Sequence, residues 1–298
     1  MPIKGCLAGQ KMGFRLFVLV GSAIGVSLLF SILVLIATAF THNSLQVTMQ
    51  NSNYLKVVQL LSTLLLFLLP AWFLAYLSSR NAISYLFAHK GASSVVVLLT
   101  ILSVVVMQPF LNLTVDWFAN WSFPPFLSDL ERWFKSMEKQ NTDLVKLFLN
   151  VSSPGALLFN LFVVALVPAV GEEFFFRGAL QRLFSEKMNI HAAVWFAAVI
   201  FSAVHMDVGG FFPRVALGAF LGYLLVWSGS IWIPVIAHFI NNFWGVLSAY
   251  LVYNQYVDKS IDKFGIGTTE WVSWVGLLLC ACFIWLLFRQ RIRSPKPE

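Results

Sequence analysis

The fold class is decided by a stretch near the N-terminus, residues 16–40, which reads LFVLVGSAIGVSLLFSILVLIATAF. It contains no charged residue and exceeds the ~20 apolar residues that an α-helix needs to cross the hydrocarbon core of a membrane. It is also too long for the core of a signal peptide and lacks a convincing cleavage site, so we expect it to be retained. The first predicted span therefore covers residues 14–40, with Arg15 at its edge.

The composition of the whole 298-residue chain agrees with this interpretation. Hydrophobic residues make up 59% of the chain and charged residues only 11%, whereas an average soluble domain is about 25% charged. So few charges cannot cover the surface of a water-soluble globule, which excludes an ordinary soluble enzyme, a disordered protein and a nucleic-acid binder. The three cysteines form no CxxC pattern, so neither a disulfide framework nor a thiolate metal site is indicated.

Seven further apolar stretches bring the number of predicted spans to eight, of which the sixth is the shortest. They cover residues 57–78, 93–111, 154–171, 190–206, 213–228, 231–253 and 271–288. No internal repeat or flexible linker divides the chain. We therefore predict an all-α polytopic membrane helix bundle that forms a single membrane domain over residues 1–298.

The distribution of Lys and Arg predicts the orientation of this bundle. With eight spans, twelve basic residues fall on one side: Lys4, Lys11, Arg15, Arg80, Lys90, Arg177, Arg182, Lys187, Arg289, Arg291, Arg293 and Lys296. Basic residues gather on the cytoplasmic side of membrane proteins, so we expect both termini in the cytoplasm. The other side carries eight basic and nine acidic residues, so the net charge of +7 is mostly a sign of topology.

The long outer loop, residues 112–150, is the one segment that resembles soluble protein. Ser128 and Glu131 have the spacing of a capping box, and Leu130, Trp133, Phe134 and Met137 then recur at helical spacing. The pattern predicts an amphipathic helix, which would lie on the outer membrane surface or over the mouths of the spans. A connector with one buried face fits the same pattern.

Ionisable residues inside a membrane are functional candidates because each costs about 2.5–3.5 kcal/mol to insert. The first cluster is Glu172-Glu173-Phe-Phe-Phe-Arg177, predicted at the cytoplasmic end of the fourth span. Glu173 and Arg177 are spaced i, i+4 and can neutralise each other. Glu172 then faces elsewhere among phenylalanines, where a carboxylate suits the role of general base. A solvated, salt-bridged pair of acids at the membrane interface explains the same residues.

Two more clusters carry histidine. His205 lies near the predicted outer end of the fifth span, and His238 and Asn242 share one face of the seventh span at i, i+4. Each has a structural explanation, as a hydrogen-bonded interfacial group or as polar contacts between helices.

Together with Glu172, these residues would supply a base, its orienting partner and donors for an oxyanion, which are the groups needed to hydrolyse a peptide bond. Glu172, His205 and His238 could instead ligate zinc. The predicted spans place His205 and Glu172 at opposite ends, so cooperation requires a short or offset fifth span or a deeper Glu172.

The ordered motifs E-E-x-x-x-R, F-x-x-x-H and H-x-x-x-N resemble those of the CPBP intramembrane proteases, the type II CAAX prenyl endopeptidases and their bacteriocin-processing and immunity relatives. The match covers residues 155–245, with Phe201 and His205 in the second motif. The resemblance implies an eight-helix fold with a cavity open towards the cytoplasmic side. It also implies that Glu172 activates water held by His205, His238 and Asn242 stabilise the oxyanion, and Glu173 and Arg177 support the site. No metal is favoured by the resemblance, although the family has also been labelled metalloprotease.

The leading hypothesis is therefore an integral-membrane endopeptidase with no resident cofactor, zinc being the alternative. Its expected partners are membrane lipids and a peptide or protein substrate, including prenylated or membrane-tethered ones, and no nucleic acid. Two other functions fit the residues. One is a non-catalytic immunity or scaffold protein that binds peptides in the same cavity. The other is a transporter, which the small number of intramembrane charges disfavours.

Overall fold

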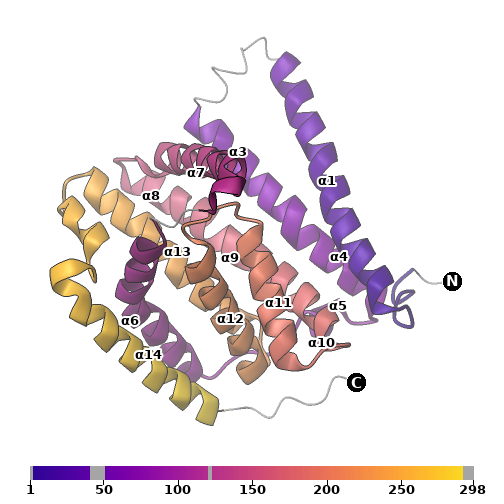
Figure 1. Cartoon of the computed structure of the whole chain (residues 1–298). Coiled ribbons are helices and arrows are strands. Elements are labelled where there is room, and N and C mark those ends of the chain that lie inside the picture. Colours follow the sequence, from indigo (N-terminus) through magenta and orange to yellow (C-terminus); the bar gives the residue numbers. More distant parts are fainter. Residues whose placement is uncertain (1–2, 41–50, 120–122, 291–298) are drawn as a thin grey trace.

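The structure is a computed structural model that describes residues 3–40, 51–119 and 123–290. Every regular element in these residues is a helix, so the predicted all-α class is confirmed. The principal helices are α1 (Met12–Phe40), α3 (Ser52–Thr63), α4 (Leu69–Ser78), α6 (Ser94–Ala119), α7 (Ser128–Leu149), α8 (Pro154–Asn160), α9 (Val167–Glu173), α10 (Arg182–Ser185), α11 (Ile190–Ala203), α12 (Phe211–Ser228), α13 (Trp232–Tyr253) and α14 (Glu270–Arg289). The short helix α5 (Ala82–Tyr85), three π-helical segments and three 3-10 segments complete the regular elements of the described residues (Figure 1).

Seven continuous helices in the described part of the chain are long and apolar enough to cross a membrane. Helix α11, with 14 residues, is the shorter apolar helix that would make the eighth. At 1.5 Å per residue it extends only about 21 Å, less than the ~30 Å of a hydrocarbon core. We expected the sixth span to be the shortest, but in the structure the fifth span is the shortest.

The second and fourth spans are continuous helices interrupted by π-helical turns. The turn Leu64–Leu68 precedes Pro70, and the turn Leu161–Leu166 precedes Pro168. Proline has no N–H and its ring clashes with the preceding helical turn, so a local change of hydrogen bonding accommodates it. The helix that contains Pro168 continues through η4 (Phe174–Gln181) to Ser185, well beyond the predicted end at residue 171.

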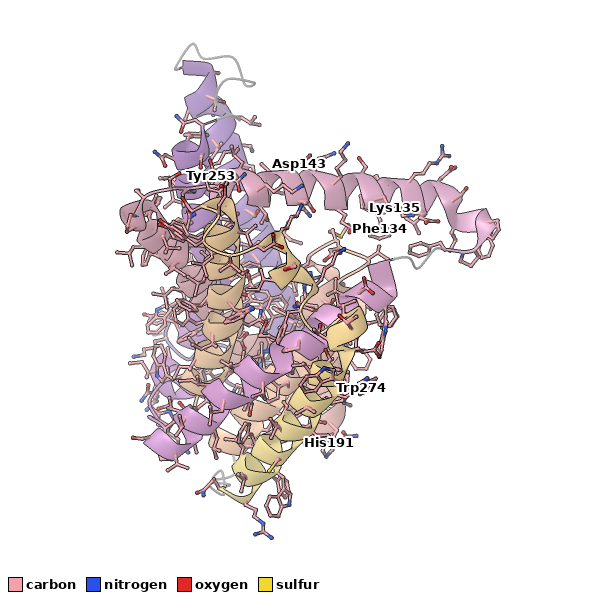
Figure 2. The ribbon with its side chains drawn as sticks, turned by 90° about the vertical axis from the view of Figure 1, so that its left-hand side faces the viewer. Phe134, Lys135, Asp143, His191, Tyr253 and Trp274 are labelled. Carbon is pink, nitrogen blue, oxygen red and sulfur yellow. The ribbon has the colours of Figure 1, made fainter. Side chains whose placement is uncertain are left out.

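Helix α7 confirms the predicted amphipathic helix, and Figure 2 shows it lying across the end of the bundle where Tyr253 lies. The predicted capping box is wrong. Leu127 occupies the N-cap without a side-chain hydrogen bond, and Glu131 pairs with Lys135 at 2.6 Å. In a capping box, the Glu131 side chain would accept a hydrogen bond from the backbone N–H of Ser128. Here the Glu131 carboxylate instead forms an i, i+4 ion pair with Lys135.

Candidate active site

Glu172 and Glu173 lie in the interior of the fourth span. Glu172 stands eighteen positions after Pro154 and thirteen before Ser185, the two ends of the continuous helix. The prediction that this pair sits at the cytoplasmic end of the span is therefore wrong. Charged residues were taken as the end of the span, but the helix continues past them, and Glu173 and Arg177 pair with each other inside it.

Glu173 and Arg177 form the predicted i, i+4 ion pair, with Arg177 Nη1 2.7 Å from Glu173 Oε1. Both side chains are almost fully buried, at 0% and 1% exposure. Arg177 also donates from Nη2 to the carbonyl of Gly218 at 3.0 Å and lies 4.4 Å above the ring of Phe201. Arg177 thus joins three helices and does not mark the membrane surface.

His238 is held by the same carboxylate. Its Nδ1 lies 2.8 Å from Glu173 Oε1, and the imidazole side chain is 5% exposed. An ionised carboxylate can only accept hydrogen bonds, so this contact assigns the hydrogen to Nδ1. The second ring nitrogen, Nε2, then faces Glu172, with 3.9 Å between it and Glu172 Oε2.

His205 approaches Glu172 from the turn that follows α11. Its Nδ1 lies 2.7 Å from the carbonyl oxygen of Phe201, an acceptor, so Nδ1 carries the hydrogen here as well. Its Nε2 lies 4.0 Å from Glu172 Oε2. Because α11 is short and Glu172 is deep, two residues expected at opposite ends of their spans lie side by side.

A compact turn, residues 204–210, fixes His205. Asp207 accepts from the backbone N–H of Gly210 at 3.0 Å and from Arg214 Nη2 at 2.6 Å. Met206 adopts a φ of 53°, in the left-handed region that most side chains avoid. A Cβ on Gly210 would lie 2.3 Å from Asp207 Oδ2, so a larger residue here would displace the ion pair.

Asn242 follows His238 by one helical turn on α13, as predicted. Its Oδ1 accepts from Asn241 Nδ2 at 3.3 Å, and Asn241 Oδ1 accepts from Gln108 of α6 at 3.3 Å. Among the described residues, no hydrogen bond joins Asn242 to Glu172 or to a histidine. Asn242 is oriented by hydrogen bonds through Asn241 to α6, one helical turn from His238.

The fit of the cluster to zinc can be judged from its distances. Ligands about 2.0–2.1 Å from a tetrahedral zinc lie about 3.3 Å from one another, whereas Glu172 Oε2 is 3.9 and 4.0 Å from the two histidine nitrogens. No group of three or more His, Cys, Asp and Glu side chains in the described ranges has the arrangement of a metal site. As arranged, these residues do not match a tetrahedral zinc site, and no step is assigned to a metal.

Lys56 is an intramembrane residue that the sequence analysis missed because the second span was started at residue 57. The structure extends that span to Ser52, and the Lys56 side chain is buried, without a hydrogen bond or ion pair to any described residue. On α3, Lys56 belongs to a polar stripe with Ser52, Gln59 and Thr63. This stripe packs close to the cluster, because a Cβ added to Gly171, which precedes Glu172, would lie 3.2 Å from the Thr63 side chain. The i, i+4, i+7, i+11 spacing of these polar residues was the available signal.

Fold and cluster together define a helical membrane protein with a buried Glu–His site. Residues 154–244, which include all the predicted site residues, match the family model described as "Type II CAAX prenyl endopeptidase Rce1-like". The resemblance derived from the three motifs is confirmed for this segment.

Two curated proteins of Bacillus subtilis (strain 168) are similar to this chain. "Uncharacterized protein YpbD" is 31% identical over 99 residues, 32% of this chain and 46% of that protein. "Putative membrane peptidase YdiL" is 27% identical over 122 residues, 41% of this chain and 48% of that protein. The chain thus spans about half the length of the curated relatives it matches. No solved structure matches. The similarity to a CAAX-type protease family is thus carried by the segment 154–244.

Proposed function

We propose that this chain is an integral-membrane endopeptidase in which Glu172 activates a water molecule to hydrolyse a peptide bond. The observation that carries the proposal is the spacing around Glu172 Oε2, which is 3.9 Å from His238 Nε2 and 4.0 Å from His205 Nε2. These gaps are too long for direct hydrogen bonds, but one water about 2.8 Å from each atom can bridge them. Glu172 Oε2 is buried and accepts no hydrogen bond from any described residue.

The hydrogen positions assign different tasks to the two histidines. His205 directs its Nδ1 hydrogen to the Phe201 carbonyl, so in its neutral form Nε2 has a lone pair that can accept a hydrogen from the water and orient it. His238 keeps its Nδ1 hydrogen on Glu173. To donate to an oxyanion from Nε2 it must be an imidazolium, and the Glu173 carboxylate stabilises that charge.

In the proposed reaction, Glu172 takes one proton from the water while the water oxygen attacks the scissile carbonyl carbon. The resulting oxyanion accepts from His238 Nε2–H and from the amide of Asn242. Collapse of the intermediate breaks the C–N bond, and the proton held by Glu172 passes to the leaving nitrogen. The products are a new carboxyl group and a new amine, and Glu172 is returned to its ionised form.

The test is hydrolysis of a membrane-tethered reporter peptide by the purified protein and its variants. Glu172→Gln and His238→Ala should each reduce the rate by at least ~10²-fold, because one removes the base and the other an oxyanion donor. Glu270→Gln at the start of α14 is the matched control and should keep the wild-type rate, because the described hydrogen bond of Glu270 comes from Trp274 on its own helix. Full activity in both site variants would show that the site is assigned to the wrong residues.

Metal dependence is tested separately on the same preparation. The proposal predicts that activity survives chelation and that purified protein carries no stoichiometric zinc. Zinc at one equivalent per chain, with activity abolished by chelation and restored by zinc, would replace this mechanism with a metal-dependent one.

A second candidate function is non-catalytic binding of a peptide or protein partner. The observation in its favour is the exposed apolar side of the outer segment, where Phe126 and Trp133 are 82% and 48% exposed. Under this hypothesis the cellular phenotype survives Glu172→Ala and is lost when Trp133 and Phe134 are replaced by alanine. The opposite result favours catalysis.

A further inference from the structure

The side chains of the Glu172 cluster differ in exposure, and His205 is the most exposed of them. Side-chain exposure falls from 33% at His205 to 12% at Glu172, 5% at His238 and 0% at Glu173. We call His205 and the turn 204–210 the mouth of the site, and Glu173, Arg177 and His238 its inner half. The gradient means that a reacting peptide reaches Glu172 past the mouth.

The side beyond the inner half is closed by apolar packing. Phe174, Phe175 and Phe176 follow Glu173 directly and are buried in one hydrophobic cluster with Phe201 and Leu183. The aromatic rings pack edge to face, with 5.2 Å between the centroids of Phe176 and Phe201. A polypeptide cannot approach Glu172 from this side without displacing that cluster.

The mouth lies at the end of the bundle that carries α7. Phe212, directly after the mouth, stacks on Phe118 near the end of α6, with 4.7 Å between the ring centroids. Partial burial and then the negative charge of Asp207 hold the pKa of Glu138 on α7 above its ordinary value, so these two carboxylates are neighbours. Figure 2 shows α7 across the end of the bundle opposite His191, where α11 begins.

The chain termini lie at the other end. Near the N-terminus, Leu7 donates from its backbone to Leu77 at the end of α4, and Arg15 pairs with Glu186 just after α10. Near the C-terminus, Gln290 lines a small pocket with Ser93 at the start of α6 and Ser228 at the end of α12. Figure 1 shows the start of α1 and the end of α14 at the end of the bundle away from α7.

The charges assign a side of the membrane to each end. Arg177 is left out because it is buried in the site. Eight of the other predicted cytoplasmic basic residues lie in the described part of the chain, at the end that carries the termini: Lys4, Lys11, Arg15, Arg80, Lys90, Arg182, Lys187 and Arg289. Without the buried Lys56, the α7 end has seven basic and nine acidic residues. Basic residues mark the cytoplasmic side, so the mouth faces away from the cytoplasm.

We propose that the Glu172 site is entered from the non-cytoplasmic side, and that its substrates are membrane-associated polypeptides whose scissile bond lies on that side. The substrate part rests on the proposed function. A prenylated tail made in the cytoplasm would approach the sealed side. The sequence analysis expected both cytoplasmic termini and a cavity open to the cytoplasm. The mouth and the termini lie at opposite ends of the bundle, so only one of the two expectations can hold. The distribution of basic residues favours cytoplasmic termini.

The experiment is cysteine labelling in sealed membranes of known orientation, with a thiol reagent that cannot cross them. The background replaces Cys6, Cys280 and Cys282 by alanine. Single cysteines are then introduced at the mouth by Val208→Cys and His205→Cys and on α7 by Asn141→Cys, while a variant that retains only Cys6 marks the terminal end. Cys6 and Asn141 are both exposed.

The proposal predicts that the two mouth cysteines and the α7 cysteine react in right-side-out membranes, and that Cys6 reacts only in inverted ones. It is overturned if the mouth cysteines react only in inverted membranes, react from both sides, or fail to react while the α7 cysteine does. Reaction of the α7 cysteine only in inverted membranes overturns it too. Labelling does not depend on hydrolysis, so its result tests only the side from which the site is entered. The proposed function is defeated by different results, namely an inactive wild-type protein or a fully active Glu172→Gln variant.

Discussion

The inner half and the mouth of the site use the same residue types under different constraints. In the inner half, Glu173 is 2.7 Å from Arg177 and 2.8 Å from His238, and all three side chains are at most 5% exposed. Glu172 lies between the inner half and the mouth, and its Oε2 is 3.9 Å from His238 Nε2 and 4.0 Å from His205 Nε2. Adjacent glutamates thus separate two tasks, because one is occupied by structural partners and the other retains acceptor capacity for chemistry.

The largest effect on stability is expected from a substitution in the inner half. Glu173→Ala leaves the buried guanidinium of Arg177 without its counter-charge and should lower the free energy of unfolding by about 3–5 kcal/mol. It should also abolish activity, because His238 loses the acceptor that orients it. The measurement is thermal unfolding in detergent, with Glu172→Gln as the comparison.

Glu172→Gln should keep close to wild-type stability, since no described residue donates to Glu172 Oε2, while activity falls. The test therefore compares the loss of stability in Glu173→Ala with that in Glu172→Gln. If both variants lose stability equally, the separation of tasks between the adjacent carboxylates is wrong.

The next effect comes from helix packing behind Arg177. A Cβ on Gly218 would lie 3.1 Å from Ala198 Cβ and 3.2 Å from Phe201. Gly218→Ala should therefore push α11 away from α12 and cost about 1–3 kcal/mol by overpacking. Gly245→Ala on α13 is the matched control, because nothing lies within 4 Å of its added Cβ. Equal melting temperatures for the two variants would contradict the tight α11–α12 contact.

The sequence predicted the local parts of this site better than the distant ones. The Glu173–Arg177 pair follows from i, i+4 spacing on one helix, and the structure contains it. The contact between His238 and Glu173 joins residues 65 positions apart, so it depends on helix packing that no local pattern encodes.

The depth of Glu172 was predicted wrongly for a related reason. Hydropathy cannot distinguish a charge at the interface from one neutralised inside the bundle, and Arg177, which is neutralised in this way, was therefore counted among the cytoplasmic residues. The burial of Lys56 escaped the same method, because one charge at the edge of a span was enough to shift its predicted start.

A smaller effect concerns the mouth. Asp207→Asn removes the ion pair with Arg214, whose two side chains are 25% and 22% exposed. The cost in stability should be about 1 kcal/mol. Activity should fall more clearly than stability, because the turn that aims His205 at Glu172 is loosened. Asp143→Asn on α7 is the control. An Asp207→Asn variant with wild-type activity would show that the turn does not position His205.

The smallest effect is expected on α7. Trp133 is 48% exposed, and its described ring contact is with Phe134 beside it, 5.0 Å between centroids. Trp133→Ala should therefore change the free energy of unfolding by less than about 0.5 kcal/mol. If Glu172 carries the function, peptide hydrolysis in detergent should be unchanged as well. A large loss of hydrolysis with stability intact would mean that the outer helix contacts the substrate. The mouth would then extend beyond the turn 204–210 to include α7.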